Sequence, residues 1–574
     1  MTPPDENANY VWAWAVVDEL VRNGVTDACV SPGSRSTPLT YVLSEHPDVQ
    51  VYSHLDERSS AFFALGRGKA TGRPTPVVCT SGTATANLHP AVMEADESRT
   101  PLLLLTADRP PELRETAANQ TVDQEKLYGD AVRWYKDVAE PENDERKLRS
   151  LRVTVNRAVA ESTTPERGPV HLNFPFRKPL EPSEPSDCVP GSGHETFARP
   201  DGRSYVETTK GRMRLDVDDL GDVARTVEDA SSGLVVVGPS DTLDDDAVVT
   251  FAEASGFAVA ADPLSGLRFG RTDVLGGYDA YVDLLEPPEI VLRLGSAPTS
   301  KRLKNYLRDS DARQIAVDED GRYTDACFMS DEVVVADPNP FCRAVAEKVE
   351  RPAGAWEERI AAVESSYWDA FASHHAYFEG GVLHEVARLV PETSTVFVSN
   401  SMPVRDLDRF GEPREADVDV FGNRGASGID GVTSTALGVC SAVDDHLVLV
   451  TGDLAYYHDM NGLLAVERCG VDATVVLVNN DGGGIFHMLP IEEHEPPFTQ
   501  QFKTPHGLDF EPTGDLYGIG FERVDSLDGF REAFERAVSS DGTDVVEAVT
   551  DAERSHERRE RLTDEVRDEL RRRL

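Results

Sequence analysis

The chain is long enough for several folded domains, and its charge narrows the range of partners. It has 574 residues, of which 40% are hydrophobic, so each domain can fill an apolar core. Its 102 acidic residues outnumber 57 lysines and arginines and give a formal net charge of −45. Such a surface repels nucleic acid and anionic membranes, so we expect neither as a partner.

The N-terminal residues predict an amphipathic helix. They have no basic start and carry Asp18 and Glu19 inside an apolar stretch, so they do not resemble a signal peptide. No apolar run is long enough to cross a bilayer, and we expect a cytoplasmic protein. The cysteines are odd in number and form no C-x-x-C pair, which argues against a disulfide framework or a zinc site. They are Cys29, Cys79, Cys188, Cys327, Cys342, Cys440 and Cys469.

A candidate acid lies early in the chain. Residues 51–70 (VYSHLDERSSAFFALGRGKA) predict a short strand that ends near Leu55 and a helix that opens with Glu57. The helix places alanine, phenylalanine and leucine on its buried face, and burial raises the pKa of a carboxyl group. A carboxyl group of this kind suits proton exchange with a ring nitrogen. The alternative is that Glu57 only complements the helix dipole in the first turn.

Composition breaks divide the chain into three α/β parts. Residues 179–204 are rich in Pro, Ser, Asp and Gly, and a second break follows Glu350 in RPAGAW. Between the breaks, LVVVGPS (234–240) and EIVLRLGS (289–296) have the pattern of buried strands. A nicotinamide-binding Rossmann site is the alternative for this middle part, but no G-x-G-x-x-G follows Val237. The acidic TLDDDA (242–247) is expected to be solvated surface, not a metal cage.

The segment from Gly452 to Asn480 predicts a β-α-β unit. HLVLVTGD (446–453) and ATVVLVNN (473–480) have the pattern of buried parallel strands, and DMNGLLAVERCG (459–470) has helical spacing with a glycine stop. Asp453 and Asn480 are therefore expected on two strand-end loops, at the edge where such sheets bind ligands. Because Mg²⁺ prefers one or two carboxylates together with phosphate oxygens, the unit suits a metal diphosphate. The alternative is an ordinary strand-end aspartate with two turn asparagines. Near the C-terminus, residues 553–574 predict an exposed amphipathic helix of mixed charge.

Several further segments resemble a single family. They are SPGSRSTPLT (31–40), TSGTATANLHPAVMEA (80–95), LTADRPPELRETAANQT (105–121), GPVHLNFPFRKPL (168–180) and NRGASGIDG (423–431). Together with the early glutamate and a 27-residue separation between Asp453 and Asn480 (480 − 453 = 27), they resemble the 2-succinyl-5-enolpyruvyl-6-hydroxy-3-cyclohexene-1-carboxylate synthases. These are thiamine-diphosphate enzymes of menaquinone biosynthesis. The similarity extends over essentially the whole chain, although the middle third matches mainly through PTSKRL (298–303).

The resemblance implies an architecture and an assembly. It implies three doubly wound parallel-sheet α/β domains, namely a pyrimidine-binding domain (1–185), a middle domain (205–350) and a diphosphate-binding domain (370–574). It also implies a homodimer or a dimer of dimers whose active sites lie between subunits. The strong acidity fits a salt-rich cytoplasm, where screening weakens self-repulsion.

The resemblance also implies a cofactor site. The cofactors are thiamine diphosphate and Mg²⁺, with Mn²⁺ as an alternative ion. Glu57 is the catalytic residue, because it favours the imino tautomer of the pyrimidine ring. Asp453, the side chain of Asn480 and the carbonyl of Gly482 bind the ion. The other cofactor contacts are Arg424, Ile429, Gly452, Ile485, Phe486 and Leu489, with Ile429 as the wedge that bends the cofactor and the last three as an apolar wall.

The implied substrates are 2-oxoglutarate and isochorismate, which bring two carboxylates each. Arginine pairs with carboxylates through two parallel hydrogen bonds, so a pocket for these anions needs several arginines. Ser401 and Arg405 would hold the distal carboxylate of the group derived from 2-oxoglutarate. Isochorismate would be received by Ser34, Arg35, Arg109, Asn119, Gln120 and Lys301. The implied reaction is decarboxylation of 2-oxoglutarate followed by addition of the succinyl carbanion to isochorismate.

Two alternative functions stay open on the sequence. One is a different thiamine-diphosphate enzyme, a 2-oxoacid decarboxylase or an acetolactate-type synthase. The other is a non-catalytic paralogue that keeps the fold. The chain also departs from the family pattern at Asp481, where an asparagine is more usual, and this adds a negative charge beside the expected metal loop.

Overall fold

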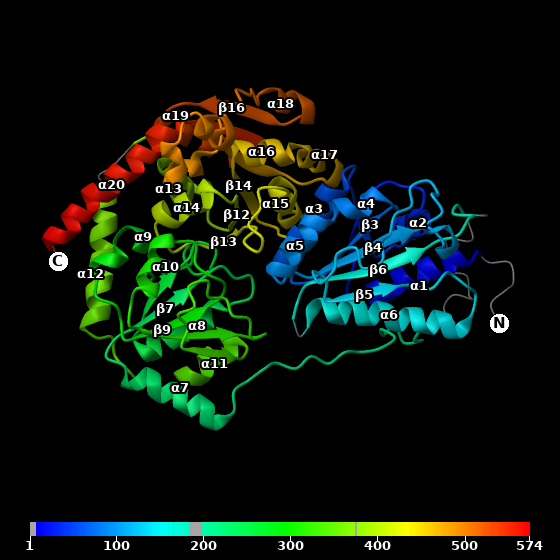
Figure 1. The fold of residues 1–574 in the computed structure, drawn as a ribbon, viewed down its shortest axis with the longest axis horizontal. Helices are drawn as coiled ribbons and strands as arrows, with labels where there is room; N and C mark the ends of the chain where they lie inside the picture. Colours follow the sequence, from blue (N-terminus) through cyan, green and yellow to red (C-terminus); the bar gives the residue numbers. More distant parts are fainter. Residues whose placement is uncertain (1–6, 165, 183–197, 373–375, 574) are drawn as a thin grey trace. The chain divides into compact units, whose positions relative to one another are not determined.

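Three parallel β-sheets follow one another along the chain (Figure 1). The computed structural model describes residues 7–164, 166–182, 198–372 and 376–573. Cys188 and most of the predicted connector at 179–204 lie outside these ranges, and the other six cysteines are free thiols. Within the described ranges, no helix combines the length and the apolar character that crossing a bilayer requires.

The first sheet is all parallel, with strand order β2-β1-β3-β4-β6-β5. Helices α1, α2 and α6 share one hydrophobic core with one face of the sheet, and α3 and α5 contact the other. The strands are Asp27–Val30, Gln50–Ser53, Thr75–Cys79, Leu102–Asp108, Trp134–Asp137 and Pro169–Pro175 (β1 to β6). The helices are α1 (Ala8–Arg22), α2 (Thr37–Glu45), α3 (Glu57–Thr71), α4 (Thr83–Asn87), α5 (His89–Glu97), η1 (Pro111–Leu113) and α6 (Glu145–Thr163).

The predicted N-terminal helix is confirmed as α1, and the structure explains its acidic residues. Glu19 is fully buried, and its carboxylate accepts hydrogen bonds from Arg152 (2.8 Å) and Asn156 (2.6 Å) of α6. Asp18 accepts a hydrogen bond from the same guanidinium. A buried carboxylate is stable only when it is paired in this way, so the charges inside the apolar stretch mark the contact with α6.

The second sheet has strand order β11-β10-β9-β7-β8 and is also parallel. The two strands predicted in the middle part are confirmed as β7 and β9. The strands are β7 (Gly233–Val237), β8 (Ala258–Ala261), β9 (Ile290–Leu294), β10 (Arg313–Asp318) and β11 (Glu332–Val335). The helices are α7 (Val217–Asp229), α8 (Asp245–Ser255), α9 (Tyr278–Tyr281), η4 (Val282–Leu284), α10 (Lys301–Arg308), α11 (Pro338–Ala346) and α12 (Ala355–Phe371).

The third sheet, of parallel strands in the order β13-β12-β14-β15-β17-β16, confirms the two strands predicted around Gly452 and Asn479. The strands are β12 (Ser394–Val398), β13 (Val418–Phe421), β14 (His446–Gly452), β15 (Ala473–Asn479), β16 (Gly520–Val524) and β17 (Asp544–Val549). The α-helices are α13 (Glu379–Leu389), α14 (Met402–Phe410), α15 (Val432–Cys440), α16 (Asp453–Asp459), α17 (Ala465–Cys469), α18 (Pro512–Tyr517), α19 (Leu527–Ala537) and α20 (Ala552–Arg573). The short helices are η5 (Met460–Leu464), η6 (Gly484–Met488), η7 (Pro490–Glu493) and η8 (Phe498–Lys503).

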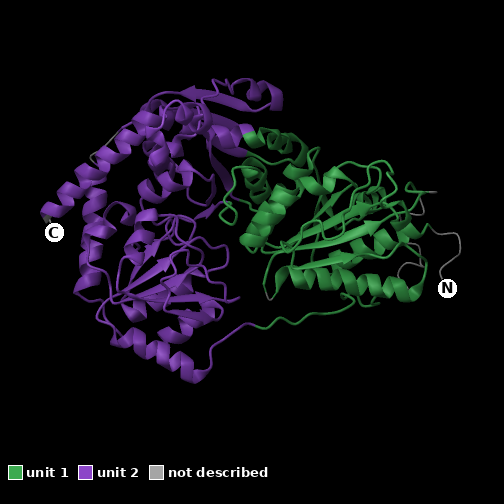
Figure 2. Cartoon of the chain, viewed as in Figure 1, with its two compact units in different colours: residues 1–211, 423–444, 458–472 green, residues 212–422, 445–457, 473–574 purple. Residues whose placement is uncertain are grey.

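The described residues form two compact units (Figure 2). Unit 1 comprises residues 1–211, 423–444 and 458–472, and unit 2 comprises residues 212–422, 445–457 and 473–574. Unit 1 therefore joins the first sheet to α15 and α17, whereas unit 2 holds the second and third sheets. In unit 1, α15 packs tightly on α3: a Cβ on Gly66 would lie 2.0 Å from the Thr435 carbonyl oxygen. The three domain boundaries expected from the sequence stay a prediction.

Two local expectations need correction. The single helix expected between β14 and β15 is three short segments, α16, η5 and α17, and the first begins at Asp453 itself. The C-terminal helix is present, but one of its faces is buried. Leu562, Val566 and Leu570 of α20 pack into the core shared with α12, so the helix is not simply exposed. This apolar stripe was not recognised in the sequence, because it contains only a few residues among many arginines and glutamates.

Candidate active site

Most of the predicted residues of unit 1 lie at the carboxyl edge of the first sheet. Ser34 and Arg35 follow β1, Glu57 follows β2, and Arg109 follows β4 directly. Asn119 and Gln120 belong to the long loop between β4 and β5. Loops that leave the same edge of a parallel sheet gather in space, which is why this edge is the usual ligand site of α/β proteins.

Arg35 and Arg109 are the cationic part of this edge. Arg35 is 4% exposed, and its Nη1 donates to the Phe176 carbonyl (2.6 Å). The Nε atoms of Arg35 and Arg109 are both buried with no hydrogen-bond partner among the described residues. Burial, and after it the positive charge of Arg109, lowers the pKa of the Arg35 guanidinium. Two neighbouring guanidinium groups with unused donors favour an anionic ligand.

The other predicted isochorismate contacts of this edge differ in how they are held. The Gln120 side chain donates to the Ser81 carbonyl (3.1 Å), and its own carbonyl accepts from the Ser81 hydroxyl (2.9 Å). Ser34 and Asn119 are exposed, and their carbonyls accept from the hydroxyls of Thr37 and Thr121. All three residues are exposed within unit 1, but the Gln120 side chain is held by its hydrogen bond to Ser81.

Glu57 is the first residue of α3, as the sequence predicts, but it is half-buried in unit 1 and not fully buried. The reason is its place at the helix start, two residues after the exposed Leu55. The helix start itself is well anchored. Asp56 accepts from the Arg58 backbone (2.8 Å) and from the Asn461 side chain (2.5 Å), and Arg58 donates to the His458 carbonyl (2.8 Å).

The segment 423–431 also belongs to unit 1, and it holds Arg424 and Ile429, both half-buried. A pocket of about 290 Å³ lies beside it. Glu94 of α5 fixes the segment, because its carboxylate accepts hydrogen bonds from the backbones of Gly425, Ala426 and Ser427. Burial raises the pKa of Glu94. The sequence did not single out Glu94, although a glutamate on the inner face of an apolar helix is a usable signal. The pocket is lined by Phe62, His89, Pro90, Met93, Glu94, Asn423, Ala426, Gly428 and Asp430.

In unit 2, the third sheet brings the predicted metal ligands together. Asp453 is buried, and its Oδ2 accepts from the backbones of Asn480 (3.1 Å) and Gly482 (2.9 Å). Burial raises the pKa of Asp453, although the hydrogen bond from the Gly482 backbone opposes the shift. The Asn480 side chain donates to Glu379 (2.7 Å), and its Oδ1 is buried without a partner in the described part of the chain. An amide oxygen that is buried and unpaired beside a carboxylate fits a cation.

Close packing fixes this loop. A Cβ on Gly482 would lie 2.1 Å from the Lys503 carbonyl, and the φ of Gly482 is 139°. Across the described ranges, no group of three or more His, Cys, Asp and Glu side chains is arranged as a metal site. An ion held here would therefore depend on one carboxylate, one amide oxygen and one carbonyl, together with the diphosphate. Mg²⁺ is commonly bound in this way.

Asp481 is the position where the chain departs from the family pattern, and its carboxylate is hydrogen-bonded to a neighbouring turn. Its Oδ1 accepts from the backbones of His506 (3.0 Å) and Gly507 (2.7 Å). The His506 ring in turn lies 3.3 Å from Asp453 through its Nε2. The extra carboxylate is thus partnered within the loop 481–507.

Ser401 and Arg405 lie at the start of α14, after β12. Ser401 precedes the helix with a φ of 72°, and Arg405 donates to the Ser401 carbonyl.

The remaining predicted residues of unit 2 differ in exposure. Lys301 is an exposed first-turn residue of α10 within unit 2. Of the expected apolar wall, Ile485 and Phe486 are half-buried, with the Phe486 ring 5.6 Å from that of Phe502, and Leu489 is exposed. Gly452 ends β14.

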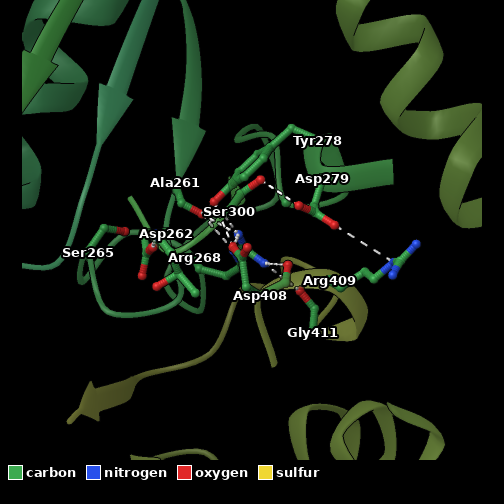
Figure 3. Close-up of polar contacts among 12 residues, drawn as sticks. Ala261, Asp262, Ser265, Arg268, Tyr278, Asp279, Ser300, Asp408, Arg409 and Gly411 are labelled. Carbon is green, nitrogen blue, oxygen red and sulfur yellow. Dashed lines mark hydrogen bonds and ion pairs between the residues drawn. The ribbon is translucent and has the colours of Figure 1, made fainter. Parts of the chain in front are cut away.

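The far end of α14 is anchored by a buried polar cluster (Figure 3). Asp408 accepts hydrogen bonds from Tyr278 (2.7 Å) and Arg268 (3.1 Å), and Arg268 also donates to the carbonyl of Ala261 at the end of β8. Burial raises the pKa of Asp408 to about 7, against the opposing charge of Arg268. The helix that carries Arg405 is thus bound to the second sheet.

Comparisons with known proteins agree with this arrangement. The chain matches "Thiamine pyrophosphate enzyme, N-terminal TPP binding domain" over residues 12–127, "Middle domain of thiamine pyrophosphate" over 217–398, and "Thiamine pyrophosphate enzyme, C-terminal TPP binding domain" over 418–548. The three matched ranges contain Glu57, Lys301 and Asp453 respectively.

Curated relatives share nearly the whole length. A protein of Haloarcula marismortui is 56% identical over 99% of this chain and 100% of its own length. A protein of Halobacterium salinarum is 55% identical over 99% of both chains, and one of Roseiflexus castenholzii is 43% identical over 97% of this chain and 98% of its own. All three are named 2-succinyl-5-enolpyruvyl-6-hydroxy-3-cyclohexene-1-carboxylate synthase. The chain therefore belongs to the 2-succinyl-5-enolpyruvyl-6-hydroxy-3-cyclohexene-1-carboxylate synthase family of thiamine-diphosphate enzymes.

Proposed function

We infer that the chain decarboxylates 2-oxoglutarate and adds the resulting succinyl group to isochorismate. The products are 2-succinyl-5-enolpyruvyl-6-hydroxy-3-cyclohexene-1-carboxylate and CO₂, and the reaction is a transferase step of menaquinone biosynthesis. The observation that carries this conclusion is identity of 56% over the full length of a relative named for this activity. The matched domains are thiamine-diphosphate-binding domains, and this is the cofactor that such a reaction needs.

The chain's own residues would divide the work between binding and proton transfer. When bound, thiamine diphosphate supplies the electron sink for decarboxylation of a 2-oxo acid. Glu57 would hold a proton at the pyrimidine ring nitrogen. Arg405 and Ser401 would bind the distal carboxylate of 2-oxoglutarate. The Arg35 and Arg109 pair would receive the carboxylates of isochorismate, as its unused guanidinium donors suggest.

Asp453, Asn480 and Gly482 would hold the ion that neutralises the diphosphate. The unpaired Oδ1 of Asn480 supports this assignment, and an all-oxygen ligand set suits Mg²⁺ or Mn²⁺. Ile485 and Phe486, in the short helix η6 that follows β15, would exclude water from the reacting carbon. The proposed compartment is a salt-rich cytoplasm, in keeping with the net charge of −45.

The proposed assembly is a homodimer or a dimer of dimers, with Glu57 of one chain serving the Asp453 of another. Mixing inactive Glu57→Gln and Asp453→Ala chains tests it, because one wild-type site per heterodimer would then form. Activity is expected to return after subunit exchange. Demonstrated exchange without any return of activity would contradict the shared site.

The reaction itself is tested by mass spectrometry. Purified protein is mixed with thiamine diphosphate, Mg²⁺, 2-oxoglutarate and isochorismate, and we expect the adduct that has lost CO₂. Pyruvate, as a simple 2-oxo acid, serves as the comparison substrate. Turnover of pyruvate without formation of the isochorismate adduct would instead identify a decarboxylase or an acetolactate-type synthase.

A further inference from the structure

We propose that Arg559, in the C-terminal helix α20, positions two separate parts of the active site at once. One is the metal ligand Asn480, and the other is α14, the helix that carries Arg405. This inference rests on the proposed function, since it assumes that Asn480 binds the ion and that Arg405 binds 2-oxoglutarate. All of the residues involved belong to unit 2.

Arg559 lies between two buried carboxylates from different elements. Its Nε and Nη2 each donate to one oxygen of Asp406, both at 2.6 Å. Its Nη2 also donates to Glu379 at the start of α13. The three side chains are almost inaccessible, at 3% for Arg559 and 1% for each carboxylate. The two carboxylates outweigh burial and hold the pKa of Arg559 above its usual value.

On the metal side, Glu379 decides which way the Asn480 amide faces. The amide nitrogen of Asn480 donates to Glu379 Oε1 (2.7 Å). An ionised carboxylate can only accept, so it must face the NH₂ group, and the amide oxygen Oδ1 is left to face the cation. Without Glu379 the amide could turn and present its NH₂ group to the ion. Partners behind a ligand commonly set its orientation in this manner.

On the substrate side, Asp406 fixes the rotation of α14. Asp406 directly follows Arg405 in this helix. The Arg559 guanidinium that hydrogen-bonds to Asp406 therefore also determines where Arg405 points. The two parallel hydrogen bonds need a planar, forked donor. A lysine carries the same charge but cannot make the pair of bonds to Asp406 while also reaching Glu379.

Four variants separate the two sides. Glu379→Ala touches only the metal side, Glu379→Gln keeps an acceptor for Asn480, Asp406→Asn touches only the substrate side, and Arg559→Lys touches both. Arg567→Lys is the matched control, because Arg567 lies on the same helix and makes a comparable ion pair to Asp283 (2.6 and 3.0 Å) away from this network. Asp453→Ala is the reference for direct loss of a metal ligand.

Two quantities are measured: the dissociation constant of Mn²⁺ in the presence of thiamine diphosphate, by electron paramagnetic resonance of the free ion, and the KM for each substrate. Glu379→Ala should weaken Mn²⁺ binding about 10- to 100-fold, and Glu379→Gln should weaken it less. Asp406→Asn should raise the KM for 2-oxoglutarate, not that for isochorismate. Arg559→Lys should do both, whereas Arg567→Lys should do neither.

The inference is overturned if Arg559→Lys keeps wild-type Mn²⁺ affinity and wild-type KM for 2-oxoglutarate, or if Arg567→Lys produces the same losses. Glu379→Gln, which changes neither size nor shape, decides the metal side if Arg559→Lys does not fold. Loss of Mn²⁺ in Asp453→Ala but in neither Glu379 variant would reject the inference and leave the proposed metal site intact. Unchanged binding in Asp453→Ala would reject the proposed metal site and the inference with it.

Discussion

In the proposed mechanism, the carboxyl group of Glu57 acts through its ability to exchange a proton, more than through its charge. Glutamine has the same shape, so Glu57→Gln should preserve the anchored start of α3, where Asp56 and Arg58 make the contacts. We therefore expect this variant to fold and to bind thiamine diphosphate while losing at least about 10²-fold in turnover, the usual size of a proton-transfer contribution. Turnover and cofactor affinity, measured side by side, test this. Near-normal product formation would remove Glu57 from the mechanism.

The arginines of the two units should differ in the substrate that they serve. Arg405→Ala is expected to raise the KM for 2-oxoglutarate, and Arg109→Ala that for isochorismate. Loss of a buried hydrogen bond between charged groups costs on the order of 2 to 5 kcal/mol, which is enough to separate the two effects in steady-state kinetics. The exposed Lys301 provides a comparison, with a smaller effect expected. The division of the pocket is wrong if both arginine variants affect one substrate only.

Sequence patterns located those residues that directly follow a strand, and missed those that act from further away. Asp453 comes directly after an apolar strand, so its place at a sheet edge follows from the strand pattern alone, whereas Arg109, which also directly follows a strand, was given only by the family resemblance. Glu379 and Arg559 could not be found in this way. They lie 180 residues apart and meet only in the folded chain, and the charges around Arg559 resemble those of any exposed helix.

Among the elements, β6 carries a buried histidine that should make unit 1 sensitive to acid. His171 Nε2 lies 2.7 Å from the Thr106 hydroxyl, which itself donates to Asn173. The hydroxyl must therefore accept from Nε2–H, and Nδ1 is left without a proton and, within the described residues, without a partner. Burial lowers the pKa of His171 to about 3, because a charge there would be desolvated.

The sign of the pH effect follows from this shift. Below about pH 6.5 the unfolded chain binds a proton at His171, whereas the folded chain binds one only near pH 3. The contribution of the neutral His171 to the free energy of unfolding is therefore fully present above pH 6.5 and is lost as the pH falls from 6.5 toward 3. The loss is at most about 5 kcal/mol, at about 1.4 kcal/mol for each pKa unit. His171→Gln should flatten the decline in free energy of unfolding between pH 6.5 and 4, measured with urea. The exposed His494→Gln should follow the wild type, and equal slopes in all three proteins would contradict the prediction.

Some of the elements could be predicted and others could not. The central strands were found because strands buried on both faces are short, continuous apolar runs. The helix between β14 and β15 was expected to be continuous, but Asp459 turns inward to accept from the backbone and hydroxyl of Ser434 in α15. That contact links segments that are 25 residues apart, and helical periodicity contains no information about it.

For the whole molecule, the net charge of −45 should make stability depend on salt. At 1 M salt the screening length falls to about 3 Å, which weakens repulsion between carboxylates on the surface. We expect the melting temperature to rise from low to molar potassium chloride. Activity should level off sooner, because salt also screens the arginines that we propose attract the anionic substrates. Thermal unfolding across this range is the measurement, with sucrose at matched osmolality as the control, and a flat or falling melting temperature would exclude salt adaptation.

The packing of α15 on α3 also sets the order in which the protein can be completed during synthesis. Val432, where α15 begins, is made 361 residues after Thr71, the last residue of α3 (432 − 71 = 361). At about 5 to 20 residues per second, the ribosome needs roughly 20 to 70 s to make this stretch. For that time the face of α3 that carries Gly66 lacks its partner helix, and the first sheet itself is complete only when β6 ends at Pro175. Until the last third of the protein emerges, that face of α3 therefore has no α15 to cover it.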